Sequence, residues 1–167
     1  CEMLNKNVQT FIACDAEYDD ATIVLFGAGF DGTTSFRPGT RFAPSAIRND
    51  SFGIETYSPY QDKDMLDFSY FDSGDLELPF GSTNRVIADI ASRSAQILRD
   101  GKLPFMIGGE HLVTLGSVMA VADTYEDLHI VHFDAHADLR NDYLGQKLSH
   151  ACVLRRCHEI VGDGHIF

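Results

Sequence analysis

The sequence predicts a three-layer α/β/α fold in which helices cover both faces of a mainly parallel β-sheet. Four short and nearly continuous apolar runs are spread along the chain, and such runs are typical of strands buried on both faces. Segments with the amphipathic spacing of helices separate the second, third and fourth runs. Strands that alternate with helices favour a parallel sheet, because parallel strands need long crossover connections.

Each expected strand is followed by turn residues or polar residues, and the four expected strands span residues 22–26, 68–71, 103–107 and 128–133. A helix is expected to begin after Ser82 or Thr83 and to end near Leu98, with Gly101 just beyond it. Further helices are expected within residues 112–122 and 151–159. Residues 164–167 resemble the start of another strand. We therefore expect a single domain, residues 1–167, that is incomplete at its C-terminus.

The longest irregular stretch, residues 27–40, is rich in glycine, and loops of this length are usually functional or form subunit contacts. Residues 43–48 predict the start of a helix, with Pro44 near its first position. We interpret the arginines between Arg37 and Arg48 as ties between loops or between subunits. Phosphate binding by this loop is disfavoured, since the lysine of a P-loop is lacking.

The composition excludes several classes of partner. The chain has 13 Lys and Arg against 25 Asp and Glu, a net charge of −12, which opposes nucleic acid and anionic membranes and attracts a cationic small molecule. No apolar run approaches the roughly 18 residues of a membrane span, and the N-terminal residues do not resemble a signal peptide. The cysteines suit neither a disulfide framework nor a zinc ribbon, so we expect reduced thiols in a cytoplasmic protein; they are Cys1, Cys14, Cys152 and Cys157.

A candidate metal site follows the fourth expected strand. In an extended backbone Asp134, His136 and Asp138 point to the same side, because side chains alternate between faces. His111 follows the third strand and would reach the same edge of the sheet, where ligands bind in α/β folds. Imidazoles and carboxylates without a thiolate suit Mn²⁺, with zinc or cobalt as alternatives, and a bridging carboxylate favours a pair of ions. Taken alone, the Asp-x-His-x-Asp pattern also fits a solvated polar loop.

The remaining polar residues near this site are interpreted differently. His129 and His132 lie within the expected strand, and we expect hydrogen-bonded core histidines rather than ligands. Glu110 adjoins His111 and is expected either to bind a cation or to orient an imidazole or a loop. No partner is predicted for His158 or His165.

Several motifs resemble those of the ureohydrolase family, which includes arginases and agmatinases. They are residues 36–48, Gly108-Gly-Glu-His111, Phe133-Asp-Ala-His-Ala-Asp138 and Leu148-Ser-His150-Ala-Cys. The resemblance covers residues 27 to about 156 and is closest to the agmatinase branch. It implies an arginase/deacetylase-like fold of which this chain is the N-terminal part.

The resemblance also implies roles for individual residues. His111 and Asp138 would hold one Mn²⁺, His136 would hold a second, and Asp134 would bridge both. His150 would be the catalytic proton donor and shuttle, a task that suits a histidine. The implied reaction is attack of hydroxide on a guanidinium carbon, which releases an amine and urea, and agmatine would give putrescine.

Alternatives to an agmatinase remain open. Arg140 stands where arginases usually carry an asparagine, which disfavours arginine as substrate, and Arg140 is expected to point away from the site. Guanidinobutyrase, arginase and formimidoylglutamase are other possible activities, and a single-zinc deacetylase shares the broad fold. The family's second half supplies further aspartates and a glutamate that these 167 residues do not contain. A non-catalytic scaffold with half a metal site is therefore the alternative outside enzymes. The family also implies a homo-oligomer of three or six subunits.

Overall fold

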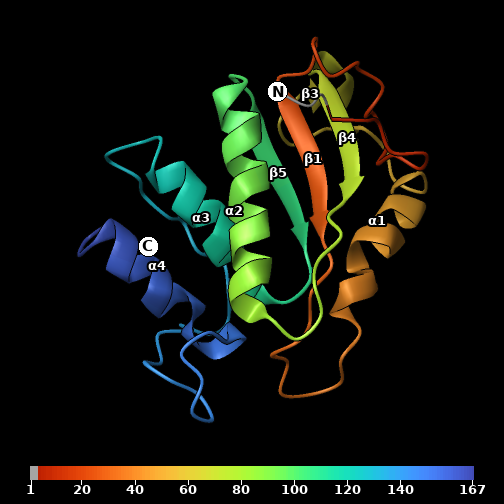
Figure 1. Ribbon diagram of the computed structural model, residues 1–167. Coiled ribbons are helices and arrows are strands. Elements are labelled where there is room, and N and C mark those ends of the chain that lie inside the picture. Colours follow the sequence, from red (N-terminus) through yellow and green to blue (C-terminus); the bar gives the residue numbers. More distant parts are fainter. Residues whose placement is uncertain (1–3) are drawn as a thin grey trace.

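A three-stranded parallel sheet with the order β4-β1-β5 forms the centre of the molecule in the computed structural model, which describes residues 4–167 (Figure 1). Its strands are β1 Ile23–Ala28, β4 Tyr70–Asp75 and β5 Leu103–Gly108. A separate antiparallel ladder joins β2 Tyr57–Ser58 to β3 Lys63–Asp64, and the sequence analysis did not predict it. The predicted α/β fold with a mainly parallel sheet is confirmed.

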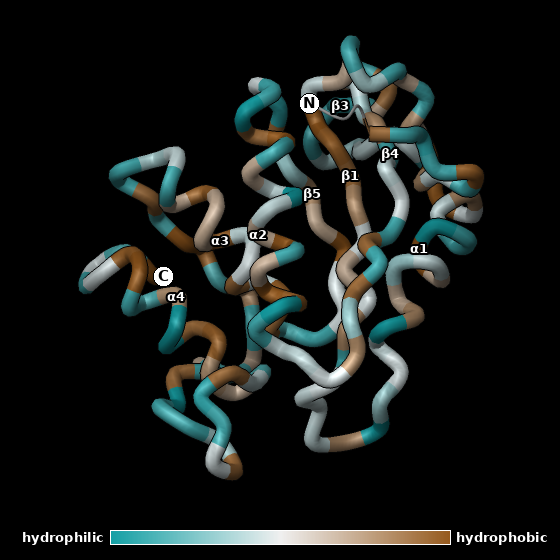
Figure 2. Tube along the Cα trace, in the orientation of Figure 1, coloured by the Kyte–Doolittle hydropathy of each residue, from teal (hydrophilic) through white to brown (hydrophobic). Residues whose placement is uncertain are grey.

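Strand β1 is buried on both faces, as its continuous apolar run predicts, and Figure 2 shows it as a hydrophobic segment. Its alternate residues belong to two separate clusters, because side chains along a strand point to opposite faces. Val24, Phe26 and Ala28 pack with Val86, Ile90 and Ile97 of α2, which spans Thr83–Arg99. On the other face, Leu25 packs beside Cys14 and Ile107, and Gly27 lies against Pro44 of α1, Ala43–Ser51. Helices therefore cover both faces of the sheet.

The helices agree with the predicted ones apart from their first turns. Helix α2 begins after Ser82, and Gly101 beyond its end has a φ of 73°. Helix α3, Thr114–Ala122, follows a 3-10 turn at His111–Val113, and α4, Val153–Val161, follows a 3-10 turn at His150–Cys152. Two other 3-10 turns precede α1 and β4; they are Thr40–Phe42 and Met65–Asp67. The turns before α3 and α4 each begin at a histidine of the predicted site.

The fourth predicted strand, residues 128–133, does not join the sheet. Ile130 forms an isolated parallel bridge with Ile166, in which Ile130 N donates to His165 O at 2.7 Å and Phe167 N donates to Ile130 O at 2.9 Å. The segment is therefore extended, but its hydrogen-bonding neighbour is the end of the chain rather than β5. The expectation that residues 164–167 start a strand is consistent with this bridge.

Arg41, in the turn before α1, and Arg48, within α1, form ion pairs within the chain, as expected for ties between loops. The guanidinium of Arg48 is buried and pairs with Asp72 and Asp75 of β4. The guanidinium of Arg41 pairs with the buried Asp31, and this hydrogen bond, with one from Gly39 N, holds the pKa of the Asp31 carboxyl below its usual range. These pairs attach the irregular stretch and α1 to the sheet.

The described cysteines are free, buried thiols, as the sequence predicts; Cys1 lies outside the described residues. Burial raises the pKa of Cys14 and that of Cys157 to about 12, so both stay protonated at neutral pH. Across residues 4–167 the helices are all too short or too polar to cross a membrane.

Gly109, just after β5, is a position where the backbone leaves no space for a side chain. A Cβ there would lie 2.4 Å from Phe30 O and 2.5 Å from Ala28 O, both of them backbone atoms. We expect Gly109→Ala to lower the free energy of unfolding by about 1–3 kcal/mol, the usual scale of overpacking, and to reduce the midpoint of urea unfolding. Gly53→Ala is the control, because its nearest contact is Asp50 O at 3.3 Å. Equal midpoints for the two variants would contradict this prediction.

Candidate functional site

An open cavity of about 910 Å³ lies beyond the carboxyl ends of β1 and β5, where ligands bind in α/β folds. Loops that follow these two strands and the segment that leads into α4 form its walls. The lining residues used below are Glu110, His111, Asp134, His136, Asp138, Arg140, Tyr143 and His150, with Ser35 and Phe36 from the loop after β1. All five predicted site residues are in this set.

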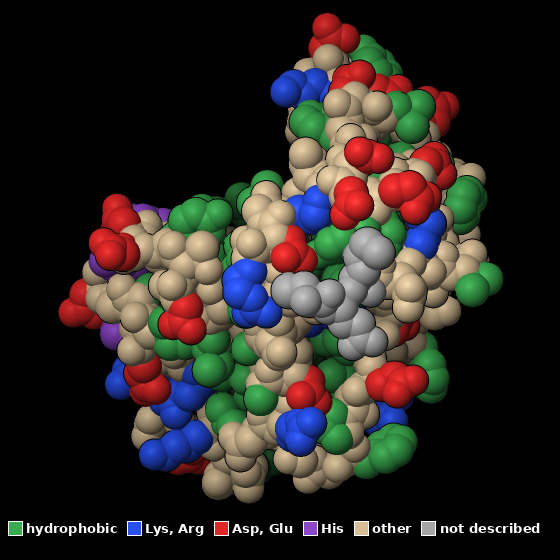
Figure 3. Space-filling model, turned by 45° about the horizontal axis from the view of Figure 1, so that its top comes forward, with side chains coloured by type: hydrophobic (Ala, Val, Ile, Leu, Met, Phe, Trp, Pro, Cys, Tyr) green, Lys and Arg blue, Asp and Glu red, His purple; other side chains and the backbone are tan. Residues whose placement is uncertain are grey.

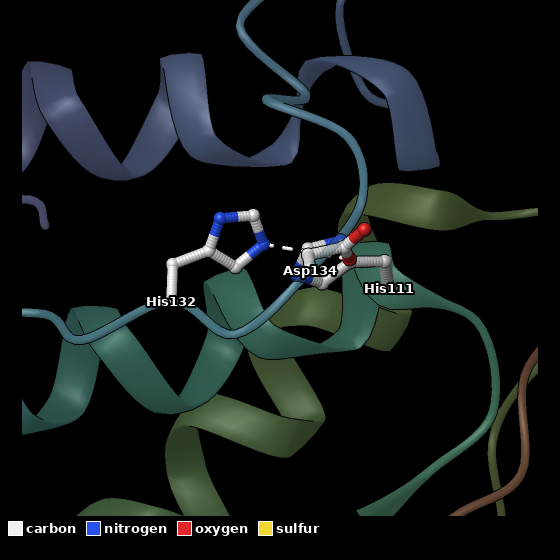
Figure 4. Close-up of side chains that lie close together, drawn as sticks. All are labelled: His111, His132 and Asp134. Carbon is white, nitrogen blue, oxygen red and sulfur yellow. Dashed lines mark ion pairs between the residues drawn. The ribbon is translucent and has the colours of Figure 1, made fainter.

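Two of the predicted metal ligands, Asp134 and Asp138, lie close to a third, His111. His111 Nδ1 is 2.7 Å from Asp138 Oδ2 and 3.6 Å from Asp134 Oδ2. Figure 4 shows the His111 ring and the Asp134 carboxylate close together. Two segments that are 23 residues apart in the sequence therefore supply one cluster of nitrogen and oxygen donors.

The Asp134 carboxylate lies at the centre of this cluster. Its Oδ1 accepts a hydrogen bond from His136 N at 2.8 Å and lies 3.3 Å from His136 Nδ1. The His136 N–H, followed by the nearby imidazoles of His111 and His132, holds the pKa of the Asp134 carboxyl below its usual range. The His136 side chain is 80% exposed. Asp134 is thus the carboxylate that reaches both histidines, and its ionised form is favoured.

The backbone at Asp138 has an unusual conformation, with a φ of 48°. Aspartate tolerates the left-handed region better than most residues, and such positions cluster at functional sites. The Asp138 carbonyl accepts hydrogen bonds from Leu154 N at 3.1 Å and Arg155 N at 3.3 Å in the first turn of α4. Helix α4 therefore holds the loop in the conformation that turns the Asp138 side chain toward His111.

His132 is the site residue that the sequence analysis assigned wrongly. Its ring stacks on that of His111, with centroids 5.2 Å apart, and its Nε2 lies 3.4 Å from Asp134 Oδ2 (Figure 4). Nε2 is buried and has no hydrogen-bond partner among residues 4–167, so His132 is not a hydrogen-bonded core histidine. The spacing of the sequence could have indicated that His132 belongs to the site, since it lies two residues before Asp134 on the same side of an extended segment. The same prediction is wrong for His129, which is not in the core: its side chain is exposed, with Nε2 3.2 Å from Asp127 Oδ1.

Glu110 orients a loop, which was one of the two roles expected for it. Its buried carboxylate accepts hydrogen bonds from the Thr33 hydroxyl and from Thr33 N, the latter at 2.6 Å. The Thr33 hydroxyl in turn accepts one from His150 N at 3.2 Å. Thr33 therefore connects the end of β5 to the turn that carries His150, and no feature of the sequence pattern indicated this role.

His150 is held in one orientation at the wall of the cavity. Its Nδ1 lies 2.8 Å from the carbonyl oxygen of Thr33, and its ring meets that of Tyr143 edge-on at 5.7 Å between centroids. Because a carbonyl can only accept, Nδ1 carries the proton, and Nε2 of the neutral ring keeps its lone pair. Nε2 lies 3.4 Å from the Ser35 hydroxyl. The ring is therefore placed to exchange a proton at Nε2.

Arg140 lines the cavity, so the expectation that it points away is wrong. Its guanidinium carbon lies 5.5 Å from the centroid of the Tyr143 ring, within the range of a cation–π contact. Its backbone N donates to Ala151 O at 3.2 Å, which fixes the loop beside the turn before α4. A positive charge is thus present in the wall of an otherwise acidic and aromatic cavity.

The donor set fits divalent cations. Two carboxylates, which can only accept hydrogen bonds when ionised, face the His111 imidazole, and the unpartnered His132 nitrogen faces one of them. Mixed nitrogen and oxygen donors without a thiolate suit first-row divalent ions. A cation placed among these groups would provide a partner for the buried His132 Nε2, which residues 4–167 leave without a hydrogen bond.

Comparison with known proteins identifies the class of α/β protein to which this fold and its cluster of histidines and carboxylates belong. Residues 21–167 match the model of the arginase family, so the chain belongs to the arginase family. It is 45% identical over 159 residues to the agmatinase of Bacillus subtilis (strain 168), and the match covers 95% of this chain and 55% of that protein. The chain thus spans about half the length of the curated relatives it matches.

Solved structures of the family share the same fold. The agmatine ureohydrolase of Thermoplasma volcanium is 36% identical with a TM-score of 0.87, and the match covers 96% of this chain and 53% of that one. The proclavaminate amidinohydrolase of Streptomyces clavuligerus is 30% identical with a TM-score of 0.85, over 96% of this chain and 55% of that one. The predicted resemblance to the ureohydrolase family is confirmed.

Proposed function

We propose that the protein carrying this chain is a binuclear manganese amidinohydrolase that converts agmatine to putrescine and urea. The observation that carries the proposal is the convergence of His111, Asp134 and Asp138, with His136 beside them, at one cavity. The similarity to agmatinases supports the choice of substrate. The net charge of −12 supports a cationic substrate.

The geometry suggests how the ligands would be divided. His111 and Asp138 would hold one ion and His136 the other, with Asp134 shared, since its two oxygens face His111 and His136 respectively. A bound pair of divalent ions supplies a hydroxide nucleophile at neutral pH by lowering the pKa of water. The remaining chemistry falls to the other residues that line the cavity.

Aromatic and histidine side chains would place the substrate and move a proton. The rings of Phe36 and Tyr143 line the cavity, and each has an arginine guanidinium over one face, that of Arg37 and Arg140 respectively. A planar guanidinium substrate would stack on the other face of either ring. His150 would first accept a proton from solvent at Nε2 and then give it to the leaving amine, while its Nδ1–H stays bonded to Thr33 O. Glu110 would keep His150 in position through Thr33.

We expect His150→Asn to leave the metal content intact while kcat falls by about 10²–10³, because asparagine cannot transfer the proton. The asparagine amide can still donate a hydrogen bond to Thr33 O, so the loop should keep its conformation. Metal analysis by plasma emission and steady-state urea release measure the two effects. His158→Asn, on the outer part of α4, is the matched control. Loss of metal in the His150 variant would instead make His150 a ligand.

Arg140 favours a second candidate substrate. Its guanidinium lies in the cavity wall, where it would repel the amine of agmatine but attract a carboxylate. A guanidino acid such as 4-guanidinobutyrate has such a carboxylate and no α-amino group. We expect Arg140→Met to raise KM for 4-guanidinobutyrate and not for agmatine if this contact forms.

The decisive experiment combines metal analysis with urea release from agmatine, arginine and 4-guanidinobutyrate, and formamide release from formimidoylglutamate. Two ions per chain and turnover of agmatine above the others would support the proposal. Preference for 4-guanidinobutyrate would support the second candidate. One zinc ion per chain would instead favour a deacetylase-like site, and bound metal without turnover of any substrate would favour a non-catalytic scaffold.

The cellular setting belongs to the same proposal. Figure 3 shows acidic side chains spread widely over one face, which agrees with the excess of acidic residues and disfavours nucleic acid or an anionic membrane as partner. Free buried thiols at Cys14, Cys152 and Cys157 suit the reducing cytoplasm. A homo-oligomer is expected, and light scattering of the purified protein measures it.

A further inference from the structure

A second cluster of potential metal ligands lies away from the cavity. Asp127 directly precedes the extended segment 128–133 that leads to Asp134, His129 lies within that segment, and His165 is near the C-terminal end of the described residues. None of the three lines the cavity described above. In Figure 3 histidine side chains lie among acidic ones at the edge of the molecule where Figure 1 places α4 and the C-terminal residues.

The three side chains already direct their donor atoms to one point. His129 Nε2 lies 3.2 Å and His165 Nε2 lies 3.3 Å from the same oxygen, Asp127 Oδ1. One donor atom of each residue falls within 4.8 Å of the others. The two rings are 4.7 Å apart between centroids and tilted by 44°, so their nitrogens converge on the carboxylate rather than stacking past it.

The hydrogen bonds of His165 determine which of its nitrogens is available. Its Nδ1 lies 2.9 Å from the backbone oxygen of Asp163, which can only accept, so Nδ1 carries a proton. In the neutral ring Nε2 then holds a lone pair and faces the lone pairs of Asp127 Oδ1. Two acceptors, His165 Nε2 and Asp127 Oδ1, repel each other at 3.3 Å unless a cation lies between them or on the ring. That cation is either a metal ion or an extra proton.

The surrounding backbone holds the ligands in place. Ile130 N donates to His165 O at 2.7 Å, and His132 N donates to Phe167 O at 2.8 Å, so two segments distant in the sequence are paired beside the cluster. The ring of His129 stacks on that of Phe167, with centroids 5.8 Å apart. Little reorganisation would be needed to bind an ion. An Nδ1–H bonded to a backbone carbonyl is also the usual support of a histidine that binds metal through Nε2.

We propose that Asp127, His129 and His165 form a second divalent metal site that links the two segments. Two imidazoles and one carboxylate leave the remaining coordination positions to water, and such donors bind Cu²⁺, Ni²⁺ and Zn²⁺ more strongly than Mn²⁺. The site joins residues 127–130 to the C-terminal residues of the chain, so its expected role is structural. It does not depend on the proposed catalytic activity.

The test is a calorimetric titration with Zn²⁺ of protein already saturated with Mn²⁺, repeated on His129→Ala and His165→Ala. We expect each variant to bind one Zn²⁺ fewer per chain or to bind it at least about tenfold more weakly. His158→Ala is the control, because its Nε2 pairs with Asp163 Oδ1 outside the cluster. Asp127→Asn provides a variant whose fold is not at risk, since the Asp127 side chain is 85% exposed.

A spectroscopic measurement separates a metal site from a protonated histidine. With Cu²⁺ as probe, electron paramagnetic resonance should show coupling to two nitrogens in the unmodified protein and to one in His129→Ala. Equal Zn²⁺ stoichiometry and affinity in all variants would overturn the proposal. So would a His165 ring that stays protonated in the presence of Zn²⁺, as measured by NMR, because the cation would then be the proton.

Discussion

Replacement of Asp134 with alanine is expected to remove most of the bound metal and to abolish hydrolysis. Its two carboxylate oxygens face His111 and His136, so a single side chain contributes to both proposed ion positions. Loss of a residue that only orients a ligand typically costs about 10–100-fold in metal affinity or activity, and loss of a shared ligand should cost more. Plasma emission analysis and a urea assay on the protein that carries this chain measure the effect.

Two further variants show whether the carboxylate itself is responsible. Asp134→Asn keeps an acceptor for His136 N and preserves the local turn, so it isolates the loss of charge. Asp142→Ala removes an exposed carboxylate from the same segment and should keep both metal and activity. The site assignment is wrong if the alanine variant at Asp134 retains two ions and a near-normal rate.

The parts of the fold that could be predicted from the sequence are those in which burial is set locally. Strand β1 is apolar at every position because Val24 and Leu25 belong to two different hydrophobic clusters, one on each face of the sheet. Helix α2 has one apolar stripe, with Ile90 and Ile97 buried completely against the sheet. In both elements the hydrophobic pattern reports the environment directly.

The pairing of residues 128–133 could not be predicted in the same way. Hydrophobicity indicates that a segment is extended, but it does not say which strand supplies its hydrogen bonds. Here the neighbour of Ile130 is Ile166, 36 residues further along the chain, and Phe133 remains almost fully exposed. Such a pairing depends on how the helices α3 and α4 are packed, which is a tertiary property.

The site residues also divide into those whose position could be predicted from the sequence and those whose position could not. The sequence predicted that Asp134 and Asp138 would meet His111, and the structure places both carboxylates beside it although residues 128–133 do not join the sheet. The role of Thr33 could not be predicted, because its hydroxyl connects Glu110 to His150 only once the loop after β1 has folded between them. A histidine within an apolar run is also ambiguous, and the stacking of His132 on His111 is visible only in three dimensions.

The buried ion pair of Arg48 is expected to have the largest effect on stability. Asp72 is fully buried, and its two oxygens accept hydrogen bonds from Arg48 Nε at 2.7 Å and from a second guanidinium nitrogen at 2.9 Å. Backbone N–H groups of Phe11 and Gly74 supply the remaining bonds to this carboxylate. Burial disfavours the charged guanidinium, but its hydrogen bonds to Asp72 and Asp75 outweigh this and raise the pKa of Arg48 above its usual value.

Arg48→Met should therefore lower the free energy of unfolding by about 3–5 kcal/mol, because it leaves the Asp72 charge buried without its counterion. Urea unfolding followed by circular dichroism gives this value from the shift of the midpoint. The control is Arg85→Met, which removes an exposed pair with Asp89 within α2 and should cost no more than about 0.5 kcal/mol. If the two variants unfold at the same urea concentration, the Arg48 pair does not hold α1 to β4. If adding Asp72→Asn to Arg48→Met partly restores the free energy of unfolding, the unpaired Asp72 carboxylate is the cause of the loss.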